Sequence, residues 1–549
     1  MLRTKNDVLR ETTLNYLASI DKDNPPAAHQ IETELLDSVA AQFELENAVR
    51  PKSAKWPIPS TLSFSQIADI VSYLYPVYLI PCAGSEADPS YDVLAIYQTE
   101  GPDTGIYATS EDTFRKLARQ FNYSMTGKEF AEFMQVLHDN SSRKMLCTDP
   151  DLIAVNNGIF NYRTKTLQPF DPELVFLSKS RVDYRPNPVN PVIHNTDDNT
   201  DWDVETWMQE LSDDPEIVTL LWQILGAIIR PNVHWNKSAW FYSETGNNGK
   251  GTLCALMRNI CGPATYASIP LANFSKEFML EPLIRASAII VDENDVGGFI
   301  DQAANLKAVI TNDVIQMNRK FKTPISFQFR GFMVQCLNEL PRFRDKSDSF
   351  YRRQLFVPFT KCFTGIERKY IKSDYLKRTD VLEYVLHRIL HSNYYALSEP
   401  VACRMALEEY KDFNDPIRQY AGDILPQLVW DFVPFGFLYD VYKVWFKQNS
   451  PSGSIQGRNT FINDLVNVLP MTQDWVCQGK NVLVRVRGMM DQPEPLIAKY
   501  DLNDWKNPTY TGGDWKKLCM PVLAQRYRGI MRAGTSASGK TVDEDEEEG

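Results

Sequence analysis

The sequence predicts an α/β protein whose central parallel sheet lies between a mainly helical N-terminal region and a C-terminal domain of winged-helix type. Three apolar runs predict the sheet. The first, residues 239–242, is followed by a loop rich in glycine and asparagine and then by a helical segment. The second, residues 286–291, ends at Asp292, and the third, residues 332–337, ends at Asn338. Helical segments between such strands favour parallel pairing through crossover connections.

The composition is that of a globular protein with several domains. The 549 residues are 43% hydrophobic and 23% charged, and a chain of this length holds about three or four domains. No apolar run has transmembrane length and no signal peptide is present, so we expect a cytoplasmic protein without a membrane partner. The nine cysteines form no C-x-x-C pair, which favours reduced, mostly buried thiols.

The formal net charge of −12 is unevenly distributed along the chain. Acidic residues gather in residues 197–216 and in the tail 543–548, which leaves basic stretches elsewhere. The negative total therefore does not exclude a nucleic-acid partner.

The N-terminal region, residues 1–145, mixes amphipathic helical stretches with a proline-punctuated section. A polymerase-type primase would need clustered carboxylates near a nucleotide-binding histidine, and His29 and His138 have no such company. Contact with a partner, with a second copy or with DNA, and a plain structural role, both remain open for this region. Residues 146–230 change to short strands and turns, followed by a helical segment from Trp202 to Ile229.

The loop after the first strand has the composition of a phosphate-binding loop. Its glycines allow backbone N–H groups to face a polyphosphate, the helix N-terminus adds a positive dipole end, and Lys250 supplies a charge for the β- and γ-phosphates. The pattern departs from G-x-x-x-x-G-K-[ST] at Glu244 and Gly251, so we expect Thr252 to hold the magnesium ion. A glycine-rich turn that only caps a helix is the alternative. The expected nucleotide-binding residues are Gly246, Asn247, Asn248, Gly249, Lys250, Gly251 and Thr252.

Polar side chains at the ends of the second and third strands complete a candidate hydrolytic site. Asp292 can hold Mg²⁺, and Glu293 can orient or deprotonate an attacking water. Asn338 can hydrogen-bond both the γ-phosphate and that water. Acid pairs after apolar runs also occur as helix caps, so the spacing from Lys250 gives this pair its weight.

Two basic segments follow. Residues 314–329 read as a hairpin of two apolar strands whose tip carries Arg319, Lys320, Phe321 and Lys322, suited to a phosphodiester backbone and a base. A solvated turn is the alternative reading of that tip. Further on, a guanidinium of Arg352 or Arg353 is placed to reach the γ-phosphate of a neighbouring subunit. An ion pair with acids of the preceding loop is the alternative for each arginine.

The order of these motifs resembles a superfamily 3 helicase. The match runs from the loop Gly246–Thr252 through Asp292-Glu293-Asn294 and the basic hairpin to Asn338-Glu-Leu-Pro341 and Phe350-Tyr-Arg-Arg353. More narrowly, it is similar to the phage, plasmid and genomic-island primase-helicase family that includes the poxvirus primase-helicase. The resemblance covers residues 150–470. It implies an AAA+ core, hexameric rings with ATP at subunit interfaces, and hairpins lining a channel for one DNA strand.

The C-terminal part reads as helix, loop, helix and basic strand, which suggests a winged helix. Arg458 and the second helix, with Arg485 and Arg487 on one face of an expected strand 481–487, are available to DNA. A small domain that only packs on the ring is the alternative. The expected segments are 1–145, 146–230, the motor 231–365, the helical and winged-helix part 366–490, and a basic extension with a disordered acidic tail 491–549.

These expectations combine into two functional hypotheses. The first is an ATP- and Mg²⁺-dependent hexameric helicase that translocates on single-stranded or forked DNA at the replication origin of a phage or mobile element, with replication factors as further partners. The second is an initiator ATPase that binds and melts origin duplex and leaves strand separation to a host helicase.

Overall fold

The computed structural model describes residues 3–83, 88–294, 299–300, 302–320, 322–449 and 455–535. The chain divides into two compact units, Met1–Leu407 and Glu408–Gly549. Within the described residues, none of the helices has both the length and the apolar character needed to cross a bilayer.

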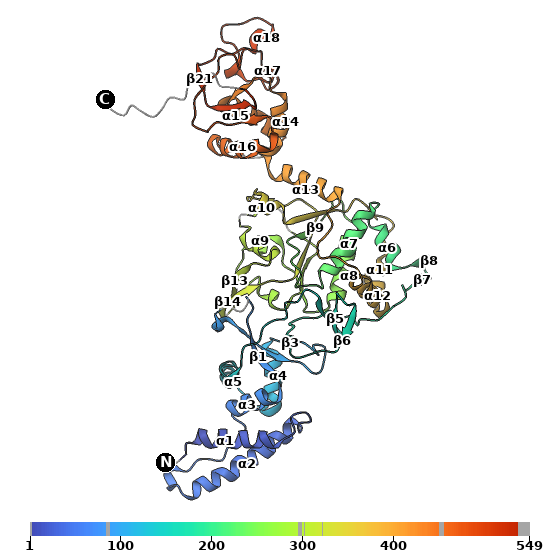
Figure 1. The fold of residues 1–549 in the computed structure, drawn as a ribbon, viewed down its shortest axis with the longest axis vertical. Coiled ribbons are helices and arrows are strands. Elements are labelled where there is room, and N and C mark those ends of the chain that lie inside the picture. The colour runs from blue at the N-terminus through green and yellow to red at the C-terminus, as the bar shows by residue number, and fades with distance from the viewer. Residues whose placement is uncertain are drawn as a thin grey trace, which may run out of the picture. The chain divides into compact units, whose positions relative to one another are not determined.

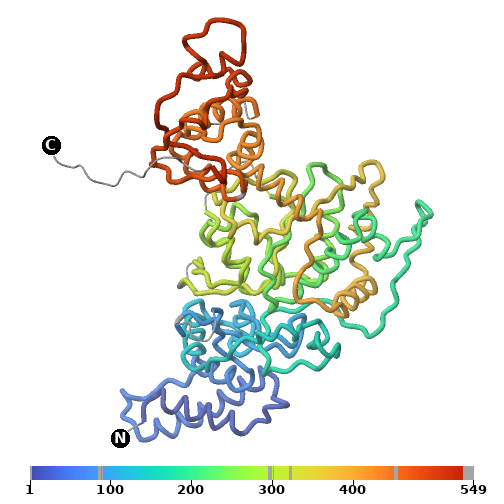
Figure 2. Tube along the Cα trace, turned by 45° about the horizontal axis from the view of Figure 1, so that its top comes forward, coloured from blue at the N-terminus to red at the C-terminus, as the bar shows by residue number. Residues whose placement is uncertain are grey.

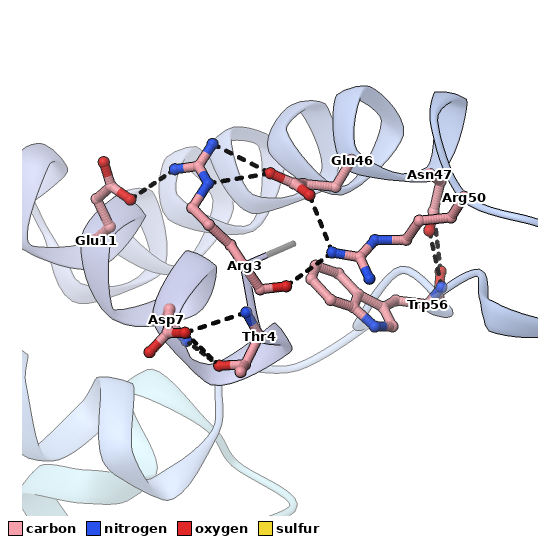
Figure 3. A network of polar contacts seen from close by, with 8 residues as sticks. All are labelled: Arg3, Thr4, Asp7, Glu11, Glu46, Asn47, Arg50 and Trp56. Carbon is pink, nitrogen blue, oxygen red and sulfur yellow. Dashed lines mark hydrogen bonds and ion pairs between the residues drawn. The ribbon is translucent and has the colours of Figure 1, made fainter. Parts of the chain in front are cut away.

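The first unit begins with two helices that lie side by side, α1 (Lys5–Ser19) and α2 (Ala28–Ala48) (Figures 1 and 2). A polar network fastens their ends (Figure 3). Arg3 donates hydrogen bonds to Glu11 at 2.6 Å and to Glu46 at 3.1 Å, and the Arg50 guanidinium lies 3.7 Å from the centre of the Trp56 ring. This helical pair thus carries its own cation–π and ion-pair contacts, and nothing in them is chemically reactive.

The remainder of the first 145 residues combines helices with a small sheet. Capping boxes at Thr4, Ser63 and Thr126 fix where three of the helices begin. The antiparallel sheet has the order β1-β2-β3. The elements are α3 (Phe64–Leu74), β1 (Val77–Ile80), β2 (Val93–Tyr97), β3 (Tyr107–Ala108), α4 (Glu111–Phe121) and α5 (Gly127–Asn140).

The strands and helices expected between residues 146 and 230 are present. A three-stranded antiparallel sheet, β4-β5-β6, precedes a β-ribbon and two helices. Asp203 and Asp214 cap the two helices through their side-chain oxygens. The elements are β4 (Leu152–Val155), β5 (Gly158–Asn161), β6 (Thr166–Gln168), β7 (Ile193–Asn195), β8 (Thr200–Trp202), α6 (Val204–Glu210) and α7 (Pro215–Ala227).

A five-stranded parallel sheet forms the centre of the first unit, as predicted. Its order is β10-β11-β15-β9-β17, and every neighbouring pair is parallel. The strands are almost fully buried, which matches their continuous apolar sequences. They are β9 (Ser238–Tyr242), β10 (Tyr266–Ala267), β11 (Ala288–Val291), β15 (Phe332–Leu337) and β17 (Gln354–Pro358).

The expected boundaries at residues 230 and 365 are not marked by separate cores. One continuous hydrophobic cluster contains side chains of α7, the central sheet and α12 (Thr379–Leu390). The helix α11 (Lys369–Ser373) adds Ile371 to the same cluster. The sheet buries its faces against elements from both sides of the motor sequence, and the division into two compact units falls within α13 (Val401–Asn414).

The second unit is built on α15 (Phe435–Asn449) and α16 (Arg458–Thr472), close to the two helices expected from the sequence. An antiparallel sheet β18-β22-β19 packs with them. Residues after 490 also enter this core, including Leu496, Ile497 and Ile530, so the expected basic extension is folded as far as residue 532. The acidic tail lies outside the described residues. The sheet strands and remaining helices are α14 (Pro416–Ile424), β18 (Phe432–Pro434), β19 (Trp475–Val476), α17 (Pro495–Lys499), α18 (Trp515–Leu518) and β22 (Gly529–Arg532).

The strand expected at residues 481–487 is wrong in extent, since only β20 (Val484–Arg485) forms. It pairs with β21 (Arg526–Tyr527), and the chain then joins a different sheet as β22. That crossing occurs at Gly529, where a Cβ atom would lie 2.1 Å from the backbone oxygen of Val433. The partner segment is therefore too short to extend the strand.

Candidate nucleotide site

The glycine-rich loop connects β9 to helix α8 (Lys250–Cys261). Gly249 caps the helix with φ of 86° and ψ of −10°, a left-handed conformation that favours glycine. A Cβ atom on Gly249 would lie 2.6 Å from Cδ2 of Leu211, whereas one on Gly246 would meet nothing within 4 Å. The two glycines thus differ. At position 249 both the positive φ and the close approach of Leu211 require a glycine, whereas position 246 has room for a side chain.

The sheet order explains how distant motifs meet. The C-terminal ends of parallel strands lie at one edge of a sheet, and ligands bind there. Strand β15 lies between β9 and β11, so Asn338 follows the strand that separates the loop from Asp292. Asn294 ties this edge together, because its amide nitrogen donates to Gln335 Oε1 and to the Cys336 carbonyl, each at 3.0 Å.

These motifs line one cavity of about 690 Å³, a volume in the range of small-molecule sites. All seven loop residues expected to bind phosphate line it, and so do Asp292, Glu293 and Asn338. Glu293 and Asn338 are exposed, whereas Lys250 is 5% exposed. The structure therefore brings together three motifs that are far apart in sequence.

Asp292 offers a carboxylate oxygen for a cation. Its Oδ2 accepts a hydrogen bond from Arg258 Nη1 at 2.7 Å, and its Oδ1 is buried without a hydrogen-bond partner. Carboxylate and hydroxyl oxygens are ligands that Mg²⁺ accepts, and Thr252 lines the same cavity. The residues present therefore fit a magnesium ion, with Asp292 and Thr252 as its protein ligands.

Lys250 lies in the cavity without a carboxylate partner in the part of the chain that the structure describes. Its ammonium donates a long hydrogen bond of 3.4 Å to the Ser243 carbonyl, and burial lowers the pKa of Lys250. Within the described residues, no carboxylate forms an ion pair with it. A bound polyphosphate would supply the missing counter-charge.

Two buried thiols lie behind Asp292. The Sγ atoms of Cys254 on α8 and Cys336 on β15 are 3.3 Å apart, and the three side chains place one donor atom each within 4.8 Å of the others. Hydrogen bonding with Cys336 and burial raise the pKa of Cys254, so this thiol stays protonated. Neutral thiols are poor ligands for Mg²⁺, so Asp292 is the one side chain of the three that offers this ion a suitable donor atom.

Several residues of the cavity were missed by the sequence analysis. Arg368, Lys369 and Lys372 line it from α11 and the residue before that helix. Lys372 Nζ lies 3.5 Å from the position that a Cβ atom on Gly251 would occupy. Trp207 and Phe363 add aromatic surface, and the Phe363 amide donates to the Asn247 carbonyl at 2.8 Å. The basic run 368–372 was the only local signal for these residues.

Three protein-family models match separate parts of the chain. Residues 91–215 match a family described as D5 N terminal like, and residues 413–507 match one described as Poxvirus D5 protein-like. These two parts of the chain are therefore similar to D5-like primase-helicase families. The family resemblance predicted from the motif order is thereby confirmed. Residues 241–353, which contain the loop, Asp292 and Asn338, match a family of unknown function, DUF5906.

Solved structures give weaker likenesses to this chain. The apo structure of the NrS-1 C-terminal region (305–718) is 12% identical with a TM-score of 0.42, covering 86% of this chain and 98% of that one. JCV helicase, solved with a bound acetamide compound, is 16% identical with a TM-score of 0.24, covering 38% of this chain and 58% of that one. Scores this low carry no conclusion. No curated protein matches the chain.

The two arginines that were expected to act on a neighbouring subunit do not line the cavity described here. Arg352 is exposed directly after α10 (Asp348–Tyr351), and Arg353 is half-buried and donates to the Ser349 carbonyl. The intramolecular ion pair considered for them is not among the contacts of the described residues.

The expected basic hairpin forms, with strands β13 (Val314–Arg319) and β14 (Lys322–Gln328). Lys320 at the tip is exposed, Phe321 lies outside the described residues, and Lys322 belongs to the strand. Arg319 is half-buried, which lowers its pKa. The Gln328 amide donates to the Cys82 carbonyl at 2.9 Å, so the base of the hairpin contacts the N-terminal region (Figure 1).

Proposed function

We propose that this chain is an ATP-dependent replicative DNA helicase or initiator of a phage or mobile element, with an AAA+ motor that translocates on single-stranded DNA. One observation carries the proposal: Lys250, Asp292 and Asn338 line a single cavity at the C-terminal edge of a parallel sheet. The D5-like family matches support the same class of activity.

The side chains divide the work of hydrolysis by their positions. Lys250 binds the β- and γ-phosphates, and burial lowers its pKa. Asp292 and Thr252 would hold Mg²⁺, which neutralises phosphate charge when bound. Glu293, exposed to the cavity, accepts a proton from the attacking water, and Asn338 orients that water. Trp207 and Phe363 supply apolar surface for the base.

We infer the oligomeric state from the position of Arg352. A hydrolytic site of this kind gains from an arginine aimed at the γ-phosphate, and Arg352 is exposed away from its own cavity. We therefore assign Arg352, or Arg353 beside it, to the site of the next subunit in a hexameric ring. Lys320 at the hairpin tip then contacts the phosphodiester backbone of the translocated strand.

The first test separates hydrolysis from folding. Lys250→Ala should abolish ATP hydrolysis while circular dichroism and the thermal midpoint stay close to those of the parent, because the ammonium makes only one long hydrogen bond. Lys377→Ala, an exposed lysine that does not line the cavity, is the matched control and should hydrolyse ATP normally. Full activity in Lys250→Ala would remove this cavity as the ATPase site.

The second test concerns DNA. Lys320→Ala should keep basal hydrolysis but lose its stimulation by single-stranded DNA, whereas Lys128→Ala, an exposed lysine on α5, should keep both. Equal stimulation in Lys320→Ala would take the hairpin out of the DNA path.

A third measurement distinguishes the two hypotheses. The purified chain with ATP and a forked duplex should displace one strand if it is a helicase. Steady hydrolysis without displacement would instead identify an initiator that melts origin DNA and leaves unwinding to another helicase.

A further inference from the structure

A second cavity, of about 730 Å³, lies wholly within the unit Glu408–Gly549. Its lining brings together four cations and two aromatic rings from segments far apart in sequence. These are Arg458, Lys506, Arg526, Arg528, Trp505 and Tyr527. The sequence placed Arg458 in an expected winged helix, and Arg526 and Arg528 in an expected basic extension, without indicating that they share a site.

The cavity carries an excess of positive charge in a chain whose net charge is −12. Two carboxylates, Asp440 and Asp504, also line the cavity, and Lys506 already forms an ion pair with Asp501. Asp440 is already engaged, because it accepts a hydrogen bond from Trp505 Nε1 at 2.9 Å and forms an ion pair with Lys443 at 2.8 Å. Within the described residues, Arg458, Arg526 and Arg528 have no ion-pair partner. Their guanidinium groups remain available to an anion from outside.

Two arginines that face each other across a strand pair are a second feature that favours an anion-binding site. Arg485 on β20 lies directly opposite Arg526 on β21 in the antiparallel register, and both side chains are exposed. Like charges at directly opposed positions of a β-pair destabilise it. A phosphate between the two guanidinium groups would turn that repulsion into two charge-assisted hydrogen bonds.

Trp505 is built as a flat platform beside these cations. Its indole is half-exposed, its Nε1 is fixed by Asp440, and Phe437 packs against it edge-on with ring centres 5.2 Å apart. The Tyr527 ring centre lies 6.3 Å away. Gly436 leaves the floor open, since a Cβ atom there would lie 3.3 Å from Arg458 Nη2 and 3.6 Å from Trp505 Cζ2.

We propose that this groove binds a short stretch of single-stranded nucleic acid. Its cations pair with successive phosphates and one base stacks on Trp505. A basic groove with an aromatic platform is the combination that sequence-tolerant single-strand binding requires. Free phosphate or an acidic peptide would use the cations but not the half-buried indole. The groove is a nucleic-acid contact additional to the hairpin, and it does not depend on ATP hydrolysis.

The test uses the full chain carrying Lys250→Ala, without nucleotide, so that turnover does not contribute. Fluorescence anisotropy measures binding of a labelled 12-nucleotide oligothymidylate. Stacking of a base contributes about 1–3 kcal/mol, so Trp505→Ala should weaken binding at least fivefold. Trp505→Phe should restore most of it. Trp515→Ala removes a tryptophan that is 46% exposed in the same unit but outside the groove, and should bind like the parent.

A surface variant guards against misfolding of Trp505→Ala. Arg526→Glu alters an exposed side chain and should weaken binding. It should also lower the salt dependence of binding. The slope of log binding constant against log salt concentration should fall in magnitude by about 0.7 for each phosphate that no longer pairs with a cation. Binding within twofold of the parent for both Trp505→Ala and Arg526→Glu would overturn the proposal.

Competitors identify the occupant. Unlabelled oligothymidylate should compete better than a 12-base-pair duplex, and oligouridylate compared with oligothymidylate decides whether RNA or DNA is preferred. Stronger competition by duplex or by an acidic peptide would also overturn the proposal. In the chain with Lys250 intact, Arg526→Glu should keep basal ATP hydrolysis, so a failed groove is distinguishable from a failed motor.

Discussion

Replacing Gly249 with alanine tests the local geometry of the phosphate-binding loop. At φ of 86° an alanine costs about 1–2 kcal/mol, and its Cβ atom would lie 2.6 Å from Leu211 Cδ2, an overpacking contact that costs about 1–3 kcal/mol. The loop escapes this strain of about 3 kcal/mol by leaving its binding conformation. ATP affinity should then fall by up to about 100-fold, since each 1.4 kcal/mol is a factor of ten.

Titration calorimetry with ATP and Mg²⁺ measures the effect, and Gly246→Ala is the matched control. It lies in the same loop, has no atom within 4 Å of the added Cβ, and should change the Kd less than about threefold. Leu211→Ala combined with Gly249→Ala should recover the part of the loss that comes from the contact, but not the part that comes from φ. An equal loss in the two single glycine variants would refute the reasoning.

Three further outcomes follow from other parts of the structure. Lys372→Ala should raise the Kd for ATP about fivefold, because one charge-assisted hydrogen bond is removed. Lys377→Ala should leave the Kd unchanged. If calorimetry gives the same Kd for both variants, Lys372 does not bind phosphate. Cys362 is exposed beside Gly246, and hydrogen bonding with Thr364 lowers its pKa. Iodoacetamide should therefore label this thiol before the other cysteines, and more slowly when ATP is bound. Peptide mass mapping measures the labelling, and a rate at Cys362 that does not depend on ATP would contradict this prediction. Glu494 is fully buried and accepts hydrogen bonds from the backbone N–H groups of Val429 and Leu496. Glu494→Ala should therefore lower the free energy of unfolding of the second unit by about 3 kcal/mol, and its thermal midpoint with it. Burial raises the pKa of Glu494, so the carboxyl keeps its proton in the folded protein at pH values where the unfolded chain loses it. The contribution of Glu494 to stability therefore declines as the pH rises from 4.5 through the pKa of the folded protein. Thermal melts of Glu494→Gln at several pH values should show a smaller decline.

Local patterns in the sequence were enough for the elements that are defined by contiguous residues. The apolar run before Gly246 predicted β9, and the polar ends at Asp292 and Asn338 predicted two more strands of the same sheet. These strands are buried on both faces, so their apolar character is continuous and easily read. The strand expected at 481–487 failed for a related reason: its length depends on a partner segment that leaves at Gly529, and no local pattern shows where a partner ends.

The sequence by itself determined the chemistry that this protein can offer: a lysine in a glycine-rich loop, carboxylates and an amide at strand ends, and a family resemblance that the motif order carried. The tertiary structure decided which groups share a site. Lys372 beside Gly251, Trp207 across the cavity, and the Arg458 and Trp505 groove each join residues separated by long stretches of chain. Such contacts arise because helices and loops are packed around a shared core, and spacing along the sequence does not encode which faces meet.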